Sequence, residues 1–160
     1  MPVQSPRLRS SAHSVPRCYL LTICSGSSLD QHSNNVTLFN LVEQINLRPN
    51  SEMPPGTLIP VEVHAYFQCD TRELGVDFEV RFALVSMESG LESLSDVFVH
   101  RSATPRYRTR TGGLPMPPVA GAYELRIDWR RRGSSNFTRE PIAWPMHIAE
   151  VPEETARVTH

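Results

Sequence analysis

Regular alternation of apolar and polar residues is the dominant pattern of the chain. In residues 123–130, Tyr, Leu, Ile and Trp alternate with Glu, Arg, Asp and Arg, and residues 61–69 and 76–84 repeat this pattern. Because successive side chains of a strand point to opposite faces, each segment predicts a β-strand with one face on a core and one in water. Opposite charges on the wet faces are expected to pair across strands, at roughly 0.2–1 kcal/mol per pair.

Two segments near the start of the chain are less regular. Residues 18–24 are apolar on both faces, which is typical of a strand with neighbours on either side. Residues 36–47 carry apolar side chains at helical spacing, but they follow a Ser-Asn-Asn turn and equally fit a strand that is apolar on both faces. We expect a strand there.

The second half of the chain ends in a strand that contains proline. Residues 96–101 and 106–111 predict short strands, and alternation over residues 142–148 predicts the last one. Pro141 and Pro145 cannot donate to a hydrogen-bond ladder, so the last strand is expected at an edge.

The predicted fold class is all-β. Strands joined by loops rich in Pro, Gly, Ser and Asn, with no long helix, predict an antiparallel immunoglobulin-like β-sandwich of about seven to eight strands. The chain has 160 residues, 39% of them hydrophobic, which suits one domain and excludes a wholly disordered protein. We expect this domain over residues 17–151, after a disordered leader at 1–16 that is rich in Ser and Arg, and before a mobile tail at 152–160. No apolar run reaches the ~18 residues of a membrane-spanning helix.

Two stretches resemble a known family. The stretch CYLLTICSGSSLDQHSNNVTLFNLVEQI (18–45) resembles the opening hairpin of a family of small bacterial immunoglobulin-like β-sandwich proteins of unknown function. GGLPMPPVAGAYELRI (112–127) resembles the later segment of that family, in which a Pro-rich loop and a Gly-x-Tyr open a strand. The resemblance implies that the hydroxyl of Tyr123 anchors the preceding loop. It implies a fold and no activity.

Charge is distributed unevenly along a nearly neutral chain. All 16 basic residues are Arg, against 17 acidic residues, and residues 101–132 contain eight Arg against Glu124 and Asp128, a net charge of +6. Strict alternation projects the Arg side chains of residues 106–110 from one strand face. If the arginines of the 123–130 strand lie on a neighbouring strand and face the same way, one patch of five charges results; its members are Arg106, Arg108, Arg110, Arg126 and Arg130.

The predicted function is a non-enzymatic interaction module that docks an acidic protein partner through this patch, because Arg is enriched at interface centres. The first alternative is nucleic-acid binding by the same arginines, although the aromatic residues of these strands alternate away from the Arg face. The second is an envelope sandwich anchored by a lipid on Cys24, since Leu-Thr-Ile-Cys has the outline of a lipoprotein cleavage site. A bacterial cytoplasmic location is expected from the cysteine usage and the lack of a convincing signal peptide.

No catalytic, cofactor or metal site is predicted. The chain has no G-x-S-x-G elbow, and its three cysteines, at 18, 24 and 69, are expected to be small buried residues. A metal site could combine His64, Cys69, His100 and His147. However, the first two have opposite strand parity and should point to opposite faces.

Overall fold

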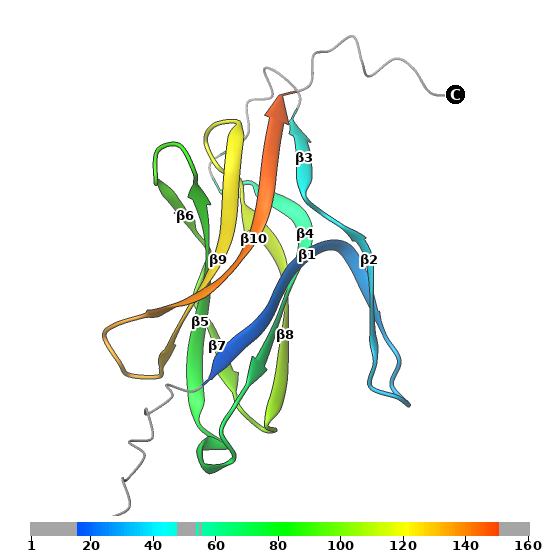
Figure 1. Cartoon of the computed structure of the whole chain (residues 1–160), viewed down its shortest axis with the longest axis vertical. Helices are drawn as coiled ribbons and strands as arrows, with labels where there is room; N and C mark the ends of the chain where they lie inside the picture. The colour runs from blue at the N-terminus through cyan, green and yellow to red at the C-terminus, as the bar shows by residue number, and fades with distance from the viewer. Residues whose placement is uncertain (1–15, 48–53, 55, 151–160) are drawn as a thin grey trace, which may run out of the picture.

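The computed structural model describes residues 16–47, 54 and 56–150 (Figure 1). Most of the predicted leader and the whole predicted tail lie outside the described residues. Within the described part the chain forms strands joined by turns, with one short 3₁₀ helix at Thr71–Glu73, so the all-β prediction is confirmed. The strands are β1 Arg17–Leu29, β2 Val36–Leu41, β3 Gln44–Leu47, β4 Leu58–Gln68, β5 Asp77–Ser86, β6 Glu92–Leu94, β7 Phe98–Arg101, β8 Arg106–Pro115, β9 Gly121–Arg131 and β10 Thr138–Glu150.

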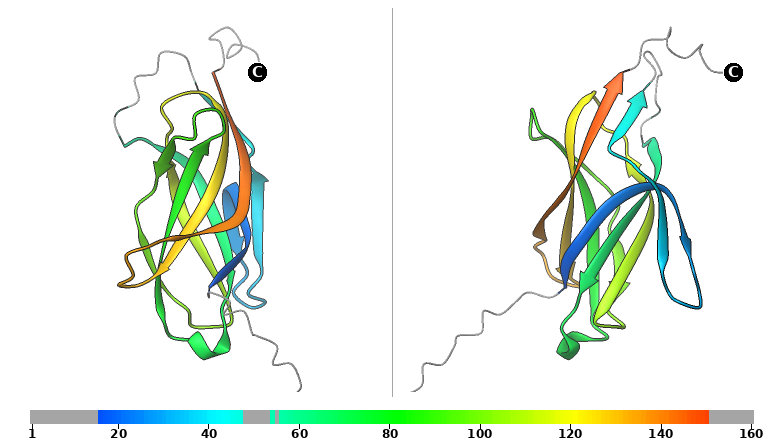
Figure 2. Two further views of the ribbon diagram at one scale, coloured as in Figure 1. Left: turned by 60° about the vertical axis from the view of Figure 1, so that its left-hand side comes forward. Right: turned by 45° about the vertical axis from the view of Figure 1, so that its right-hand side comes forward.

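These strands form two sheets. Sheet A has the order β2-β1-β4-β8, and sheet B has the order β3-β10-β9-β5-β6, with β7 also paired to β5. Every pairing is antiparallel except that of β3 with β10. The two sheets face each other across one core (Figure 2).

The alternating segments place their apolar residues in this core, as predicted, with the exception of Val76, which precedes β5 and is 36% exposed. Phe67 of β4, Phe82 of β5 and Ile127 of β9 are at most 1% exposed. Burying each such side chain contributes about 1.5–3 kcal/mol relative to leaving it in water. Tyr123 is also buried, and its hydroxyl donates a 2.7 Å hydrogen bond to the Val119 carbonyl, which confirms the expected anchor of the preceding loop.

The segment at 36–47 is extended, as predicted, but it is divided between the two sheets. Strand β2 pairs with β1 in sheet A, whereas β3 runs parallel to β10 in sheet B. The chain crosses at Val42, whose N–H donates to the Ile23 carbonyl and whose carbonyl accepts a 2.8 Å bond from Trp144 Nε1. Val42, Ile45 and Leu47 pack against the core, whereas Leu41 is 57% exposed, so the helix-like spacing does not mark one buried face.

The prediction that the last strand lies at an edge is wrong for β10 as a whole, since β10 lies between β3 and β9. However, β3 pairs only with His147–Glu150. Pro145 lies in the part of β10 that β3 leaves unpaired, and Pro141 lies in the register shift between Arg139 and Ala143. Pro145 therefore needs no N–H group towards β3, and Pro141 lies where the ladder between β9 and β10 is irregular.

Candidate functional site

The predicted patch of five arginines is divided between the two outer faces of the molecule. Arg106, Arg108 and Arg110 lie on β8 in sheet A, whereas Arg126 and Arg130 lie on β9 in sheet B. The condition that the two strands are neighbours is not met, because the connection from β8 to β9 crosses between sheets. The single patch is therefore wrong, and the two groups must be considered separately.

The outer face of sheet B is a network of ion pairs. Arg130 Nε lies 2.5 Å from Glu79 Oε2, and the two residues are directly opposite each other on β9 and β5. Asp128 accepts from Arg81 Nε at 3.0 Å and from Arg139 Nε at 2.7 Å. The predicted pairing of opposite charges across strands is confirmed on this face.

The remaining sheet B arginine is also satisfied within the fold. Arg126 donates to the Glu124 carboxylate and, at 3.3 Å, to the Pro141 carbonyl. The guanidinium groups of Arg81 and Arg130 lie 4.2 and 4.3 Å from the centre of the Phe137 ring. These arginines therefore stabilise the sheet surface and leave little charge available for a partner.

The three arginines of sheet A are in different environments. Arg110 Nη2 lies 2.9 Å from Glu62 Oε1, and Arg108 donates to the carbonyl and side-chain oxygen of Asn34, at 2.9 and 2.6 Å. Arg106 is exposed and makes no ion pair with any residue that the structure describes. Of the three guanidinium groups on this face, only that of Arg110 pairs with a carboxylate of the described residues.

The hairpin of β1 and β2 folds back along the outer face of sheet A (Figures 1 and 2). Strand β1 pairs with β4 as far as Cys24 and with β2 beyond it. Two contacts hold the hairpin: Ser27 Oγ donates to Glu62 Oε2 at 2.6 Å, and the turn is bound by Arg108 through Asn34. The hairpin therefore covers residues of β4 that strand parity alone assigns to solvent.

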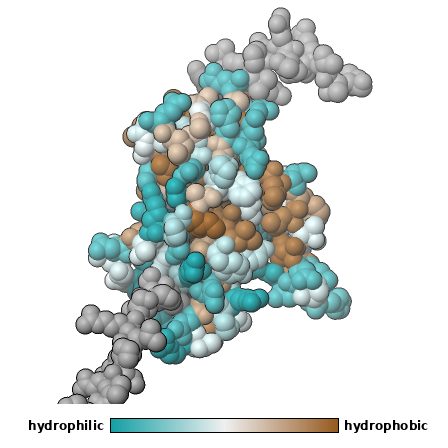
Figure 3. Space-filling model, viewed as in Figure 1, coloured by the Kyte–Doolittle hydropathy of each residue, from teal (hydrophilic) through white to brown (hydrophobic). Residues whose placement is uncertain are grey.

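Aromatic and apolar side chains accompany the sheet A arginines. Tyr66 of β4 is directly opposite Arg108, and the Tyr19 ring meets it edge-on with centroids 6.2 Å apart. Within β8, the aromatic residue points away from the Arg face, as expected. The neighbouring strands β4 and β1, however, place Tyr66 and Tyr19 beside the arginines. Exposed apolar residues gather over β1 and β2 (Figure 3); they are Tyr19, Leu20, Leu29, Phe39 and Leu41, which are 40–57% exposed.

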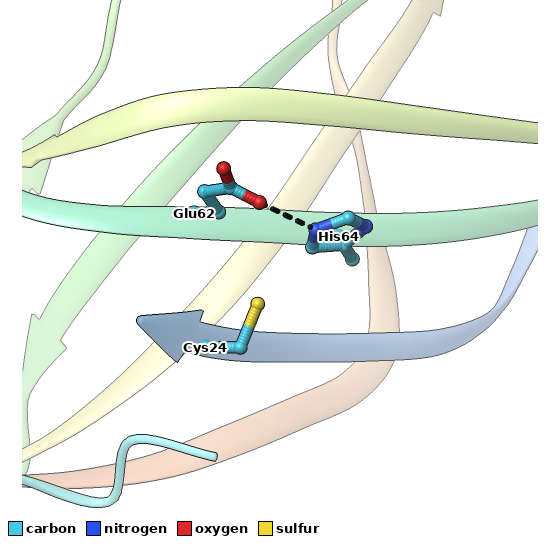
Figure 4. A group of neighbouring side chains, drawn as sticks. All are labelled: Cys24, Glu62 and His64. Carbon is cyan, nitrogen blue, oxygen red and sulfur yellow. Dashed lines mark hydrogen bonds and ion pairs between the residues drawn. The ribbon is translucent and has the colours of Figure 1, made fainter. Parts of the chain in front are cut away.

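A buried polar cluster lies where the hairpin meets β4. The Cys24 sulfur of β1 points towards Glu62 and His64 of β4 (Figure 4). One ligand atom from each residue lies within 4.8 Å of the other two, and His64 Nε2 is 3.2 Å from Glu62 Oε2. Cys24 and His64 are 0% and 2% exposed, whereas the Glu62 side chain is 18% exposed.

The protonation of this cluster follows from its contacts. Burial raises the pKa of the Cys24 thiol, so the sulfur is protonated at neutral pH. The hydrogen bond from Ser27, with smaller contributions from His64 and Arg110, holds the pKa of Glu62 below its usual value despite partial burial. The carboxylate is therefore ionised and accepts from His64 Nε2–H.

The metal set considered from sequence does not come together. Cys69 is buried in the core and His64 lies on the outer side of β4, as their opposite parity predicts. No motif in the sequence pairs Cys24 with Glu62, because only the register of β1 against β4 brings these residues together. The burial of Cys24 also counts against a lipid anchor, since cleavage before it would remove the part of β1 that pairs with β4.

No protein-family model matches the chain, and a search of curated proteins finds no match. Over the described residues, none of the helical structure has the length and apolar character needed to cross a membrane.

Proposed function

We propose that this protein is a non-enzymatic docking module with an immunoglobulin-like fold, and that the outer face of sheet A binds an acidic protein segment that also carries apolar side chains. One observation carries the proposal: this face combines an unpaired Arg106 with exposed apolar residues, whereas the arginines of sheet B are neutralised within the fold. Arg and aromatic residues are the side chains most enriched at the centres of protein interfaces.

The chemistry of the partner follows from the charge of this face. Among the described residues, Arg110 is the only one of Arg106, Arg108 and Arg110 that pairs with a carboxylate, that of Glu62, so a carboxylate-bearing segment meets an electrostatically complementary surface. The exposed apolar residues of β1 and β2 supply apolar surface that the partner can bury, which a purely electrostatic contact lacks. Three buried thiols without a disulfide favour a reducing compartment, and we place the protein in a bacterial cytoplasm.

Single-stranded nucleic acid is the second candidate for the same face. The juxtaposition of Tyr66 with Arg108 supports it, because base stacking on aromatic rings beside guanidinium groups is how such strands are bound. A protein partner is favoured because Tyr66 is only partly exposed, while three of the five exposed apolar residues of β1 and β2 are aliphatic.

The decisive variant is Arg106→Glu, because it reverses one charge without removing a side-chain hydrogen bond or ion pair to any described residue. The tagged protein is used to capture partners from host lysate treated with nuclease, beside the triple variant R106S/R108S/R110S. The matched control is R126S/R130S on sheet B. The proposal expects one protein that survives nuclease, is retained by the sheet B control, and is lost with both sheet A variants.

Two results contradict the protein-docking proposal. If the partner is retained by both sheet A variants, or is lost equally with the sheet B control, the outer face of sheet A is not the docking surface. If only nucleic acid is recovered and its affinity falls steeply with salt, the second candidate replaces the first, because each neutralised phosphate releases counterions.

A further inference from the structure

We propose that Cys24, Glu62 and His64 bind one transition-metal ion of the zinc type, with a fourth position left for water. This site lies under the β1–β2 hairpin, and none of its three ligands is proposed to contact the docked partner. Thiolate, imidazole and carboxylate are the ligands that Zn²⁺ takes in proteins, and three protein ligands with one open position form a recurrent arrangement.

The distances fit such an ion. Ligand bonds of 2.0–2.3 Å at tetrahedral angles place the ligand atoms roughly 3.3–3.6 Å apart. The His64 and Glu62 atoms are already 3.2 Å apart, and all three ligand atoms lie within 4.8 Å of one another. The Cys24 sulfur must therefore come closer to the other two ligand atoms by at most about 1.2 Å. Rotation of the Cys24 side chain can supply this movement.

The surrounding contacts hold the carboxylate in place. Ser27 Oγ donates to Glu62 Oε2 at 2.6 Å, and Arg110 Nη2 contacts Oε1 at 2.9 Å. Such outer contacts orient a ligand before an ion arrives. The thiolate and carboxylate together neutralise a divalent ion, so Arg110 does not face a net positive charge.

Thr22 provides a second, independent observation. This residue is directly opposite His64 on the same side of sheet A and is 3% exposed, and its hydroxyl oxygen has no hydrogen-bond partner among the described residues. A buried hydroxyl without a partner is uncommon and calls for an explanation. A water molecule on the fourth position of the ion would be a suitable partner.

The geometry favours a metal site over a catalytic triad in which Cys24 would be the nucleophile, His64 the base and Glu62 the acid. In such a triad, the nucleophile and the acid use different nitrogens of the histidine ring. Here Glu62 contacts Nε2, and Figure 4 shows the Cys24 sulfur on the same side of the His64 ring. All three groups thus converge on one point, as ligands do.

Binding has a defined proton balance. The Cys24 thiol loses its proton to solvent as the sulfur–metal bond forms. The proton that His64 Nε2 donates to Glu62 moves to Nδ1, which changes the tautomer and leaves Nε2 free to bind the ion. Glu62 is already ionised, so one ion binds with the release of one proton, and no oxidant or reductant takes part.

The test uses the untagged, metal-stripped full chain, titrated with Zn²⁺ by calorimetry and with Co²⁺ by absorption spectroscopy. We expect one tight site, one proton released at alkaline pH, and a thiolate-to-cobalt charge-transfer band. Cys24→Ala should abolish the band, and Glu62→Gln should weaken binding by at least about tenfold. Cys69→Ala, which removes a buried thiol elsewhere, is the control and should bind as the native chain does.

The proposal is overturned if the native chain shows no stoichiometric binding, or if the charge-transfer band persists in Cys24→Ala. It is also overturned if Cys69→Ala loses the band. Circular dichroism establishes that each variant is folded. If Cys24→Ala does not fold, Glu62→Gln decides alone, because that side chain is partly exposed and its replacement keeps the shape.

Discussion

Replacing Asp128 with Asn tests whether the charges of sheet B serve the fold. The Asp128 side chain is 3% exposed and accepts three hydrogen bonds, from Arg81 Nε, Arg139 Nε and Arg139 Nη2, at 2.7–3.2 Å. Asn has nearly the same shape but lacks the charge, and its amide N–H group faces guanidinium donors. The substitution therefore removes the charge and one of the two acceptor oxygens without opening a cavity.

The expected loss of stability is about 2 kcal/mol. Breaking a fully buried ion pair costs 3–5 kcal/mol, because one charge is left without compensation. Here the Arg81 and Arg139 side chains are 27% and 38% exposed, so water hydrates them once the carboxylate is gone, and Glu92 still accepts from Arg139. We discount the cost accordingly. For a chain of this size the melting temperature should fall by about 4–8 °C.

Urea unfolding of the native chain and Asp128→Asn measures this difference. Exposed Asp96, replaced by Asn, is the matched control and should change stability by less than about 0.5 kcal/mol. If Asp128→Asn also stays within about 0.5 kcal/mol of the native chain, the sheet B network contributes nothing measurable. The ion pairs of sheet B would then not stabilise the fold, and stability could not be used to separate the arginines of sheet B from those of the proposed docking face on sheet A.

Three further variants test local features. Tyr123→Phe should cost about 1 kcal/mol in urea unfolding, because one hydrogen bond to the preceding loop is lost; an unchanged midpoint would contradict the anchor. Gly113→Ala should cost more than about 1 kcal/mol, since φ is +82° and a Cβ would lie 2.9 Å from Leu58 Cδ1, whereas Gly112→Ala next to it should be nearly neutral. Burial raises the pKa of Glu140 above its unfolded value near 4.5, so the stability that its protonated form contributes is lost as pH rises through the folded pKa. Glu140→Gln should gain stability relative to the native chain over that range, and parallel pH profiles would refute this.

Alternation in the sequence was sufficient to predict the all-β class and the core-facing residues of the main strands. The segments at 61–69, 76–84 and 123–130 place apolar residues on one side and charges on the other, and this local pattern determines which side chains enter the core. Alternation does not state which sheet a strand joins. The division of residues 36–47 between sheets and the separation of β8 from β9 therefore depend on long-range packing.

The candidate sites show the same limit. The parity of β8 correctly placed Arg106, Arg108 and Arg110 on one face, but it could not show that Tyr66 lies opposite Arg108. Parity also assigned His64 to solvent, because a fold-back of the β1–β2 hairpin is invisible in the residues of β4. Register between distant strands brought Cys24 to His64, and no short motif encodes it.

The crossing at Val42 has a consequence for synthesis of the protein on the ribosome. Its carbonyl accepts from Trp144, 102 residues further along the chain, and β10 is the only strand of the described residues that pairs with β3. During translation, the apolar residues of β3 therefore stay without their partner until β10 has emerged. Such high contact order slows folding and prolongs the exposure of aggregation-prone surface. Variants that delay the docking of β10 should thus reduce the yield of soluble protein in cells more than they reduce its equilibrium stability.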